Sequence, residues 1–452
     1  MPCGEVRPDS HQSGGGRMVE RRRRAVKKLL SSRGEVVAFG GVRDGRKRRG
    51  RRWPLAPVLA AIVLGIMAKA RSVREVEDKT EDMGLLRSRF GIRRRVPRST
   101  IGRVAARAVA PSELQQHLGR TIRAEQRRKT LAPTELPVGC VALDGKGIRS
   151  VHRKAVNADC QEVHPKDGFT YYKYLVFRAV LMSARPKLCI GQQTVPGTTN
   201  EMGCFAKFFG WLMEWFGRSG LFEVVFTDSG STSKDNAALV HQANKGYVLG
   251  LKENQPELLR EAKRLLLPRL QSQPPEAETA GWEKDHRGRW IKRQMWRTFE
   301  IAAYLDWPHL QQAIVVRTLQ RLGDPRSGSC KVVVVEDRYF VSNLAVGHRL
   351  KGEPMLRAIR QYWQVEEHNR VMDVELEEDD LPYTQVGDGV PVTTLLRVLA
   401  ANLLALLRDV HLRAAENRQL PWRRVRDLVW QALVADDPEA DQLDVAETSA
   451  AS

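Results

Sequence analysis

Two short apolar runs, each ending in an aspartate, constrain the fold of this chain more than any other feature. Residues 139–143 (Gly-Cys-Val-Ala-Leu) lead directly into Asp144, and Leu221–Thr227 leads into Asp228. Short, continuously apolar segments that end at turn-forming residues are typical of strands buried inside a sheet. The two runs therefore predict an α/β core in which both aspartates follow a buried strand.

The sequence around these runs predicts the remaining elements of that core. We expect further strands at Tyr171–Met182, Pro186–Thr194 and Gly246–Lys252. Amphipathic helices are expected at Glu201–Phe216 and Lys234–Asn244. The resulting order is three strands, a helix, a strand, a helix and a strand, which indicates an α/β fold with a mixed sheet.

Changes in composition divide the rest of the chain. A Gly- and Arg-rich N-terminal stretch carries a net charge of +11 and predicts a basic arm, and helical periodicity follows it. That helical part either binds DNA or forms a cap packed on the next domain. We expect a disordered basic arm at 1–52, a helical domain at 53–130, the core at 135–255 and 346–415, a β-rich insertion at 256–345, and a disordered acidic tail at 436–452.

The charge of the whole chain suggests a partner. Its 452 residues carry 74 Lys and Arg against 53 Asp and Glu, a formal net charge of +21. A protein this basic usually meets a polyanion, because neutralising phosphates releases condensed counterions. The alternative is an alkaline protein without such a partner.

The cysteines and the apolar stretches bear on location. Six cysteines lie far apart without a Cys-x-x-Cys pair, which fits neither a zinc site nor a disulfide framework. Leu55–Ala68 is too short to cross a bilayer, and Val392–Val410 contains two arginines and an asparagine, so both are expected to be buried helices. We expect a protein of the reducing cytoplasm that is not associated with a membrane.

Three carboxylates form the candidate catalytic site. Asp144 and Asp228 can bind one Mg²⁺ if their strands are neighbours, although a lone aspartate after a strand is more often a turn former or a helix cap. A third acid, Glu366, shares one side of a predicted helix with Ile359 and Trp363. Glu367 points about 100° away round that helix. The alternative for Glu366 is an acid facing solvent.

An ordered set of motifs resembles a known family. The chain resembles the DDE transposases of bacterial insertion sequences, specifically the H-repeat-associated (ISAs-type) group, from about residue 55 to 412. The motifs are Val141-Ala-Leu-Asp-Gly-Lys-Gly-Ile-Arg149, Thr199-Asn-Glu-Met202, Phe226-Thr-Asp228, Gly246-Tyr-Val-Leu-Gly-Leu-Lys-Glu-Asn-Gln255, Arg338-Tyr-Phe-Val-Ser-Asn-Leu344, Tyr362-Trp-Gln-Val-Glu366 and Asp373-Val-Glu-Leu-Glu-Glu-Asp379. The chain departs from the family after Glu366, where one residue fewer precedes Asp373.

The resemblance implies a fold and an activity. It implies an RNase H-like core in which Asp144, Asp228 and Glu366 hold two Mg²⁺ ions, for which Mn²⁺ is expected to substitute. These ions would support strand cleavage at the terminal inverted repeats of a DNA element and strand transfer into target DNA. Two ends must be held together, so a homodimer on double-stranded DNA is expected.

Polar and aromatic residues near the acids are candidates for holding the DNA. For each of them a surface salt bridge or a role in a turn is the alternative. The candidates are Lys146, Arg149, Lys252, Asn254, Gln255, Arg360 and Trp363.

Two other functions stay open on the sequence. One is a decayed or repurposed relative of the transposases that binds DNA without cutting it. The other is a basic structural or RNA-associated protein in which the acids coincide by chance.

Overall fold

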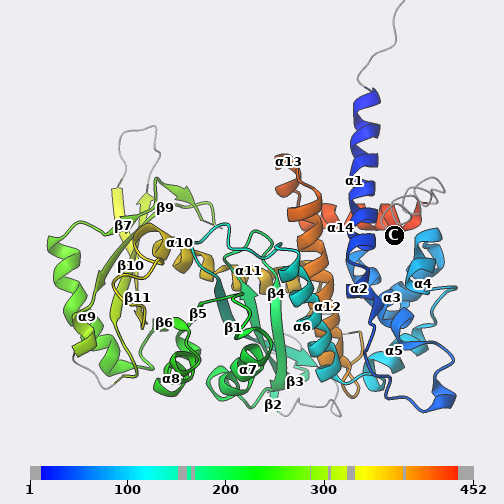
Figure 1. The fold of residues 1–452 in the computed structure, drawn as a ribbon, viewed down its shortest axis with the longest axis horizontal. Helices are drawn as coiled ribbons and strands as arrows, with labels where there is room; N and C mark the ends of the chain where they lie inside the picture. Colours follow the sequence, from blue (N-terminus) through cyan, green and yellow to red (C-terminus); the bar gives the residue numbers. More distant parts are fainter. Residues whose placement is uncertain are drawn as a thin grey trace, which may run out of the picture. The chain divides into compact units, whose positions relative to one another are not determined.

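The computed structural model divides the protein into two compact units, whose elements are labelled in Figure 1. It describes residues 12–150, 160–163, 168–285, 287–303, 307–322, 331–379 and 383–435. The helical unit contains residues 12–121 and the described residues from 371 to 435, and the sheet unit contains the described residues from 122 to 370. The predicted acidic tail and the first 11 residues of the predicted arm lie outside the described part.

A mixed sheet is the framework of the sheet unit (Figure 1). Its central strand β1 (Cys140–Ser150) pairs with β3 (Thr170–Leu181) on one side and with β5 (Val224–Thr227) on the other. The β1–β3 pair is antiparallel and the β1–β5 pair is parallel. Outside them, β4 (Cys189–Pro196) pairs antiparallel with β3, and β6 (Gly246–Leu251) pairs parallel with β5. The predicted α/β class with a mixed sheet is confirmed.

The strands of the predicted insertion continue the same sheet. β11 (Lys331–Ser342) pairs antiparallel with β6, and β10 (Gln312–Leu322) pairs with β11. β9 (Trp290–Thr298) follows β10. The insertion begins with a helix, α9 (Pro256–Ser272), because a long apolar stripe here has helical spacing. The short strands are β2 (Cys160–Val163), β7 (Ala277–Glu278) and β8 (Glu283–Lys284).

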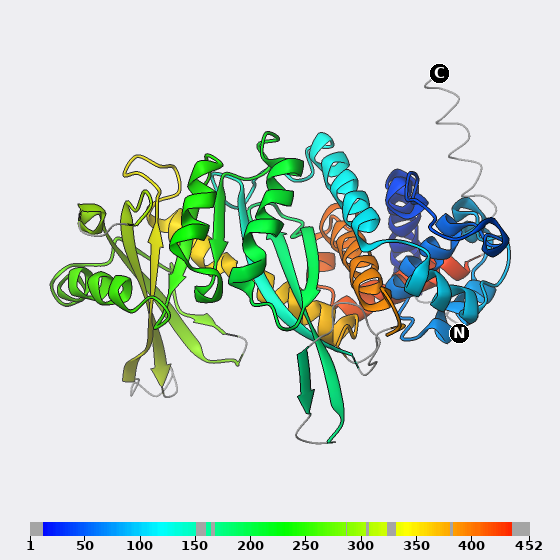
Figure 2. The same cartoon turned by 90° about the horizontal axis from the view of Figure 1, so that it is seen from below.

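Helices cover both faces of the sheet around β1. α7 (Glu201–Phe216) and α8 (Lys234–Gln242) lie on one face, and α10 (Gly352–Tyr362) and α11 (Gln364–Arg370) lie on the other (Figures 1 and 2). This covering explains why every residue of β5 is buried and why all but Thr227 are apolar.

Two apolar helices form the core of the helical unit. α3 (Leu55–Met67) packs against α12 (Gly389–Leu406), and every residue of α12 is buried. The remaining elements are α1 (Gln12–Ser32), α2 (Gly34–Ala38), η1 (Arg48–Gly50), α4 (Val73–Asp82), η2 (Leu85–Phe90), α5 (Arg98–Arg107), η5 (Val371–Glu375), η6 (Leu407–His411), α13 (Ala415–Arg418) and α14 (Trp422–Val434). α6 (Pro111–Arg127) begins in this unit. η3 (Ser229–Ser231) and η4 (Glu300–Ala303) belong to the sheet unit.

The helical unit corrects two domain predictions. Residues 12–52 were expected to be disordered, but α1 and α2 form there because Val26, Leu29 and Leu30 bury their side chains against the unit. Residues 371–415 were expected in the catalytic core, but they belong to the helical unit because α12 buries its apolar surface on α3 and α5.

Two segments are long and apolar enough to cross a membrane by length and composition. They are Arg48–Met67 and Gly389–His411, of which 61% and 100% are buried in the protein. Core helices of soluble proteins meet the same criterion, so the two segments are weak evidence for a membrane span.

The packing of α7 on the sheet gives a testable prediction. Phe208 is fully buried, and its ring meets the Phe177 ring of β3 edge-on at 5.2 Å between centroids. Phe208→Ala should lower the free energy of unfolding by about 3–5 kcal/mol, because a buried aromatic ring is replaced by a cavity. Urea unfolding followed by circular dichroism measures this. Lys207→Ala, an exposed change on the same helix, should stay within about 0.5 kcal/mol of the wild type. A similar loss in both variants would contradict this packing.

Candidate functional site

Asp144 and Asp228 converge because their strands are neighbours. β1 and β5 run parallel, with Leu143 opposite Thr227. The two aspartates are therefore the next residues on adjacent strands. Asp228 follows the end of β5, as expected, whereas Asp144 lies within β1, which continues to Ser150 along β3.

A third carboxylate joins them from α7. Glu201 is the first residue of this helix, whose N-cap, Asn200, accepts a hydrogen bond from the Gly203 amide at 2.8 Å. Among the described residues, carboxylate oxygens of Asp144, Glu201 and Asp228 all lie within 4.8 Å of one another. This spacing suits a single divalent cation bound by oxygen ligands.

Two glycines make room for the Glu201 side chain. A Cβ atom at position 145 would lie 2.4 Å from Cγ of Glu201, and one at position 230 would lie 2.8 Å from its Oε2. Both distances are shorter than non-bonded atoms allow. A larger residue at either position would therefore displace the Glu201 side chain from its place beside the aspartates.

The charges of the three acids oppose one another. Burial raises the pKa of Asp144 to about 7, and the negative charges of Asp228 and Glu366 add to the shift. Burial likewise raises the pKa of Glu201 to about 7, with further contributions from Asp228 and Asp144. Crowded carboxylates of this kind are stabilised by a bound cation, because it cancels their repulsion.

The loop after β5 is held by hydrogen bonds. The Asp228 carboxylate accepts a hydrogen bond from the Gly230 amide at 2.9 Å, and the Ser231 hydroxyl donates to Glu201 at 3.2 Å. The side-chain amide of Asn254 donates to the Ser229 carbonyl at 2.6 Å, and that of Gln255 donates to the Thr232 carbonyl at 3.0 Å. Asn254 and Gln255 were predicted to hold DNA, and in the structure these hydrogen bonds brace the loop after β5.

A chain of buried side chains fixes Asp144 from the other face. Asn369 on α11 donates to Asp144 Oδ2 at 2.9 Å. Arg178 of β3, which is fully buried, donates to Asn369 Oδ1 at 2.7 Å and to Gln192 at 2.8 Å. This chain ties α11 to the sheet.

Glu366 lies on the same helix, one turn before Asn369, and is exposed. It lines a pocket of about 390 Å³ together with Asp228, Lys252, Tyr362 and Trp363. Burial raises the pKa of Tyr362 well above its ordinary value, and the charges of Asp144, Asp228, Glu201 and Glu366 add to this rise. Glu366 thus shares a pocket with Asp228 and acts electrostatically on the same side chain as the other acids, but the tight cluster contains Glu201 in its place.

The other predicted DNA-binding residues have different surroundings. Arg149 pairs with Glu162 at 2.9 Å, and Arg360 pairs with Glu283. Lys146 lies on β1 two residues after Asp144 and is partly exposed. Lys252 is exposed at the pocket, and Trp363 lies there beneath the guanidinium groups of Arg293 and Arg338, 5.0 and 4.7 Å from its ring centroid.

Glu201 lies in one of the motifs of the sequence, but it was not predicted as a site residue. An acid in the first turn after an Asn cap is common in helices of any function, because it complements the helix dipole. That signal therefore does not separate a ligand from an ordinary helix start.

A comparison with models of known protein families found no match, and a comparison with curated proteins found none either.

The raised pKa values predict how stability depends on pH. Between about pH 4 and pH 7 the folded protein holds protons on Asp144 and Glu201 that the unfolded chain releases, so the free energy of unfolding should fall as pH rises through this range. Asp144→Asn should reduce this fall, and Mg²⁺ at pH 8 should raise the melting temperature of the wild type more than that of the variant. Thermal melts at pH 5 and pH 8 test both effects.

The control is Glu214→Gln, an exposed change on α7, which should leave the pH dependence and the effect of Mg²⁺ as in the wild type. Equal pH dependence in Asp144→Asn and wild type would count against the cluster.

The Asn369 link gives a second prediction. Asn369→Ala should lower the free energy of unfolding by about 1–3 kcal/mol, because the buried guanidinium of Arg178 loses an acceptor. Urea unfolding at pH 7 is the measurement. Glu367→Ala, an exposed change on the same helix, is the control and should cost less than about 0.5 kcal/mol. If both variants are as stable as the wild type, the link does not hold α11 to the sheet.

Proposed function

We propose that the protein is a DNA transposase of the DDE type, which cuts DNA strands at the ends of an element and joins them to target DNA with the help of Mg²⁺. The observation that carries this proposal is the convergence of Asp144, Asp228 and Glu201 within 4.8 Å, with Glu366 lining the adjoining pocket. The ordered motifs that resemble this family contain all four acids.

The strand order supports an RNase H-like core. The order β4-β3-β1-β5-β6 combines an antiparallel meander with two parallel strands that follow β1. That arrangement is compatible with an RNase H-like sheet, to which the further strands of the insertion are added. In an open α/β sheet, ligands collect where parallel strands end, and Asp228 lies at such an end.

The site also fits a divalent cation. Its donors are carboxylate oxygens, which Mg²⁺ and Mn²⁺ prefer, and they lie close enough to share one ion. Burial raises the pKa values of Asp144 and Glu201, and the neighbouring carboxylates raise them further, so a cation at this point would favour the charged form of both acids. A bound Mg²⁺ would supply Lewis-acid activation of the phosphate and lower the pKa of an attacking water.

The chain's own residues would then orient the DNA. Asp144, Glu201 and Asp228 would hold the cation from the sheet, and Glu366 would approach it from α11. Lys252 at the pocket wall would neutralise a phosphate beside the scissile bond. Arg338 lies on Trp363 and lines the same wall, so it offers a second cation to the DNA backbone. No protein nucleophile is required, because water and the freed 3′-hydroxyl attack phosphorus in turn.

A second candidate is a transposase relative that binds DNA without cutting it. Two observations favour it: Glu366 is exposed, and among the described residues it is not part of the tight carboxylate cluster. Under this proposal the protein, with its net charge of +21, would still bind DNA, and Mg²⁺ would not lead to cleavage of the DNA strands.

The decisive experiment is DNA cleavage with purified full-length protein. A duplex carrying the inverted repeats that flank the coding segment should be nicked in Mg²⁺ or Mn²⁺ and left intact in EDTA. Asp144→Asn, Asp228→Asn and Glu201→Gln should each lower the cleavage rate at least about 100-fold, since each removes a charge that holds the cation. Denaturing gels of end-labelled DNA measure the rate.

Two neighbouring glutamates provide a matched control. Glu366→Gln should lose cleavage to the same extent, whereas Glu367→Gln should retain it, because Glu367 pairs with Arg370 at 2.6 Å on the exposed side of α11. If the wild type binds the repeats and cuts under no metal condition, the second candidate is correct. If the two glutamate variants cleave equally well, Glu366 has no part in catalysis.

A further inference from the structure

α1 of the helical unit is attached by one face and leaves the other to solvent. Val26, Leu29 and Leu30 are buried, and the helix packs against α14 and η6. Its exposed face carries a basic stripe, which we define as Arg17, Arg21, Arg24 and Lys28.

The basic stripe is a continuous line of charge. Intervals of four, three and four residues place the four side chains on one side of the helix. At 1.5 Å per residue the stripe is about 16 Å long. Arg24 pairs with Glu20 at 3.3 Å, but no ion pair of Arg17, Arg21 or Lys28 is found in the described part of the chain. Like charges at such intervals repel one another, so an external anion would stabilise the stripe.

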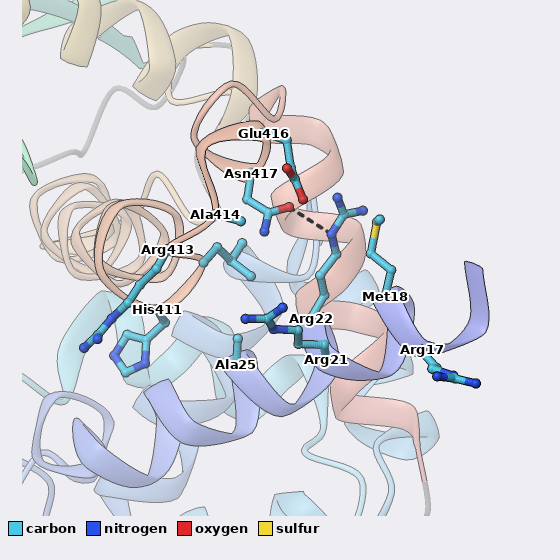
Figure 3. A pocket seen from close by; sticks show the side chains of 11 residues that line it. Arg17, Met18, Arg21, Arg22, Ala25, His411, Arg413, Ala414, Glu416 and Asn417 are labelled. Carbon is cyan, nitrogen blue, oxygen red and sulfur yellow. Dashed lines mark hydrogen bonds between the residues drawn. The ribbon is translucent and has the colours of Figure 1, made fainter. Parts of the chain in front are cut away.

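A pocket of about 330 Å³ extends this basic surface (Figure 3). One wall is α1, with Arg17, Arg21 and Arg22, and the other wall includes His411 and Arg413. Arg22 Nε donates to Asn417 Oδ1 at 3.0 Å, which connects the two walls. The lining residues include four arginines and a single acid, Glu416, so the pocket carries a net positive charge.

The surroundings of His411 reflect this positive potential. Burial lowers its pKa to about 4, and the positive charges of Arg33, Lys28 and Arg413 add to the effect. The imidazole is therefore neutral at pH 7. Its Nε2 atom is buried without a hydrogen-bond partner among the described residues.

We propose that the basic stripe and this pocket bind the phosphate backbone of duplex DNA. DNA as the polyanion rests on the proposed function, but the surface uses none of the catalytic acids. A duplex presents one negative charge per about 1.7 Å of its axis, so about nine phosphates lie along the length of the stripe. A membrane is a poorer partner, because the apolar face of α1, which would have to insert, is already buried in the protein.

The test is the salt dependence of DNA binding. Fluorescence anisotropy with a 30-base-pair duplex of arbitrary sequence, in EDTA, compares the wild type with the fourfold variant R17Q/R21Q/R24Q/K28Q. Each lost phosphate contact reduces the slope of log affinity against log salt by about 0.9, so we expect a slope smaller by about 3 to 4 and at least tenfold weaker binding at low salt. The double variant R17Q/R21Q, which changes only the outer part of α1, should show about half of this slope change.

A charge-matched control separates the stripe from net charge. R185Q/K207Q/R218Q/R260Q removes four exposed basic residues of the sheet unit and should bind DNA nearly as well as the wild type. Equal weakening of both fourfold variants, or an unchanged slope in the stripe variants, would overturn the proposal. So would a stripe variant that loses binding to vesicles with 30% anionic lipid and keeps its DNA affinity.

This experiment is independent of cleavage. In EDTA no metal-dependent cleavage takes place, and the experiment measures binding alone. A protein that never cuts DNA can therefore still give the expected result. Conversely, a protein that cuts DNA but whose stripe variants bind normally would contradict this proposal and leave the proposed function intact.

Discussion

The parallel pairing of β1 with β5 is the constraint on which the candidate site depends. With Leu143 opposite Thr227, the backbone delivers two aspartates to the same place, and they repel each other there. The protein tolerates this repulsion because hydrogen bonds fix each acid: Asn369 holds Asp144, and the Gly230 amide holds Asp228. Glu201 adds more charge at a point where only glycine fits beside it. Such an arrangement weakens the folded state unless a cation balances it, which is a common feature of sites shaped by function.

The sheet and the helical unit are stabilised in different ways. In the sheet unit, aromatic side chains of α7 pack on β3, and Arg178 is buried with polar partners. In the helical unit, α3 and α12 bury almost entirely apolar surfaces against each other. The two hydrophobic segments of the sequence thus supply the apolar contact between α3 and α12. The Tyr383 hydroxyl donates a hydrogen bond to the Ala70 carbonyl, and the Arg426 guanidinium donates one to the Ile66 carbonyl.

The sequence predicted the mixed sheet well, because continuous apolar runs between turn residues report burial on both faces directly. The same signal singled out Asp144 and Asp228, but their pairing depended on the two strands being neighbours, which the sequence left as a condition and the β1–β5 pairing fulfils. Glu201 could not be singled out in this way, since its approach depends on Gly145 and on the position of α7 over the sheet, which are tertiary effects. The sequence also failed to predict that α1 is an ordered helix. Its seven basic residues dominate the composition of this segment, and only three apolar residues anchor it. Likewise, the length of the apolar helix at Gly389–Leu406 does not reveal which unit it joins.

The hydrogen bonding between β6 and β11 has a mechanical consequence. Tyr339 lies opposite Leu251 and Phe340 opposite Gly250, so the strand that carries Arg338 is joined to the strand that follows Asp228. Adjacent strands keep a spacing of about 4.8 Å, and this spacing cannot change without breaking the ladder. The β11–β6 ladder therefore fixes the distance between the backbone around Arg338 and the strand beside Asp228, so this side of the pocket is held by main-chain hydrogen bonds whatever side chains line it.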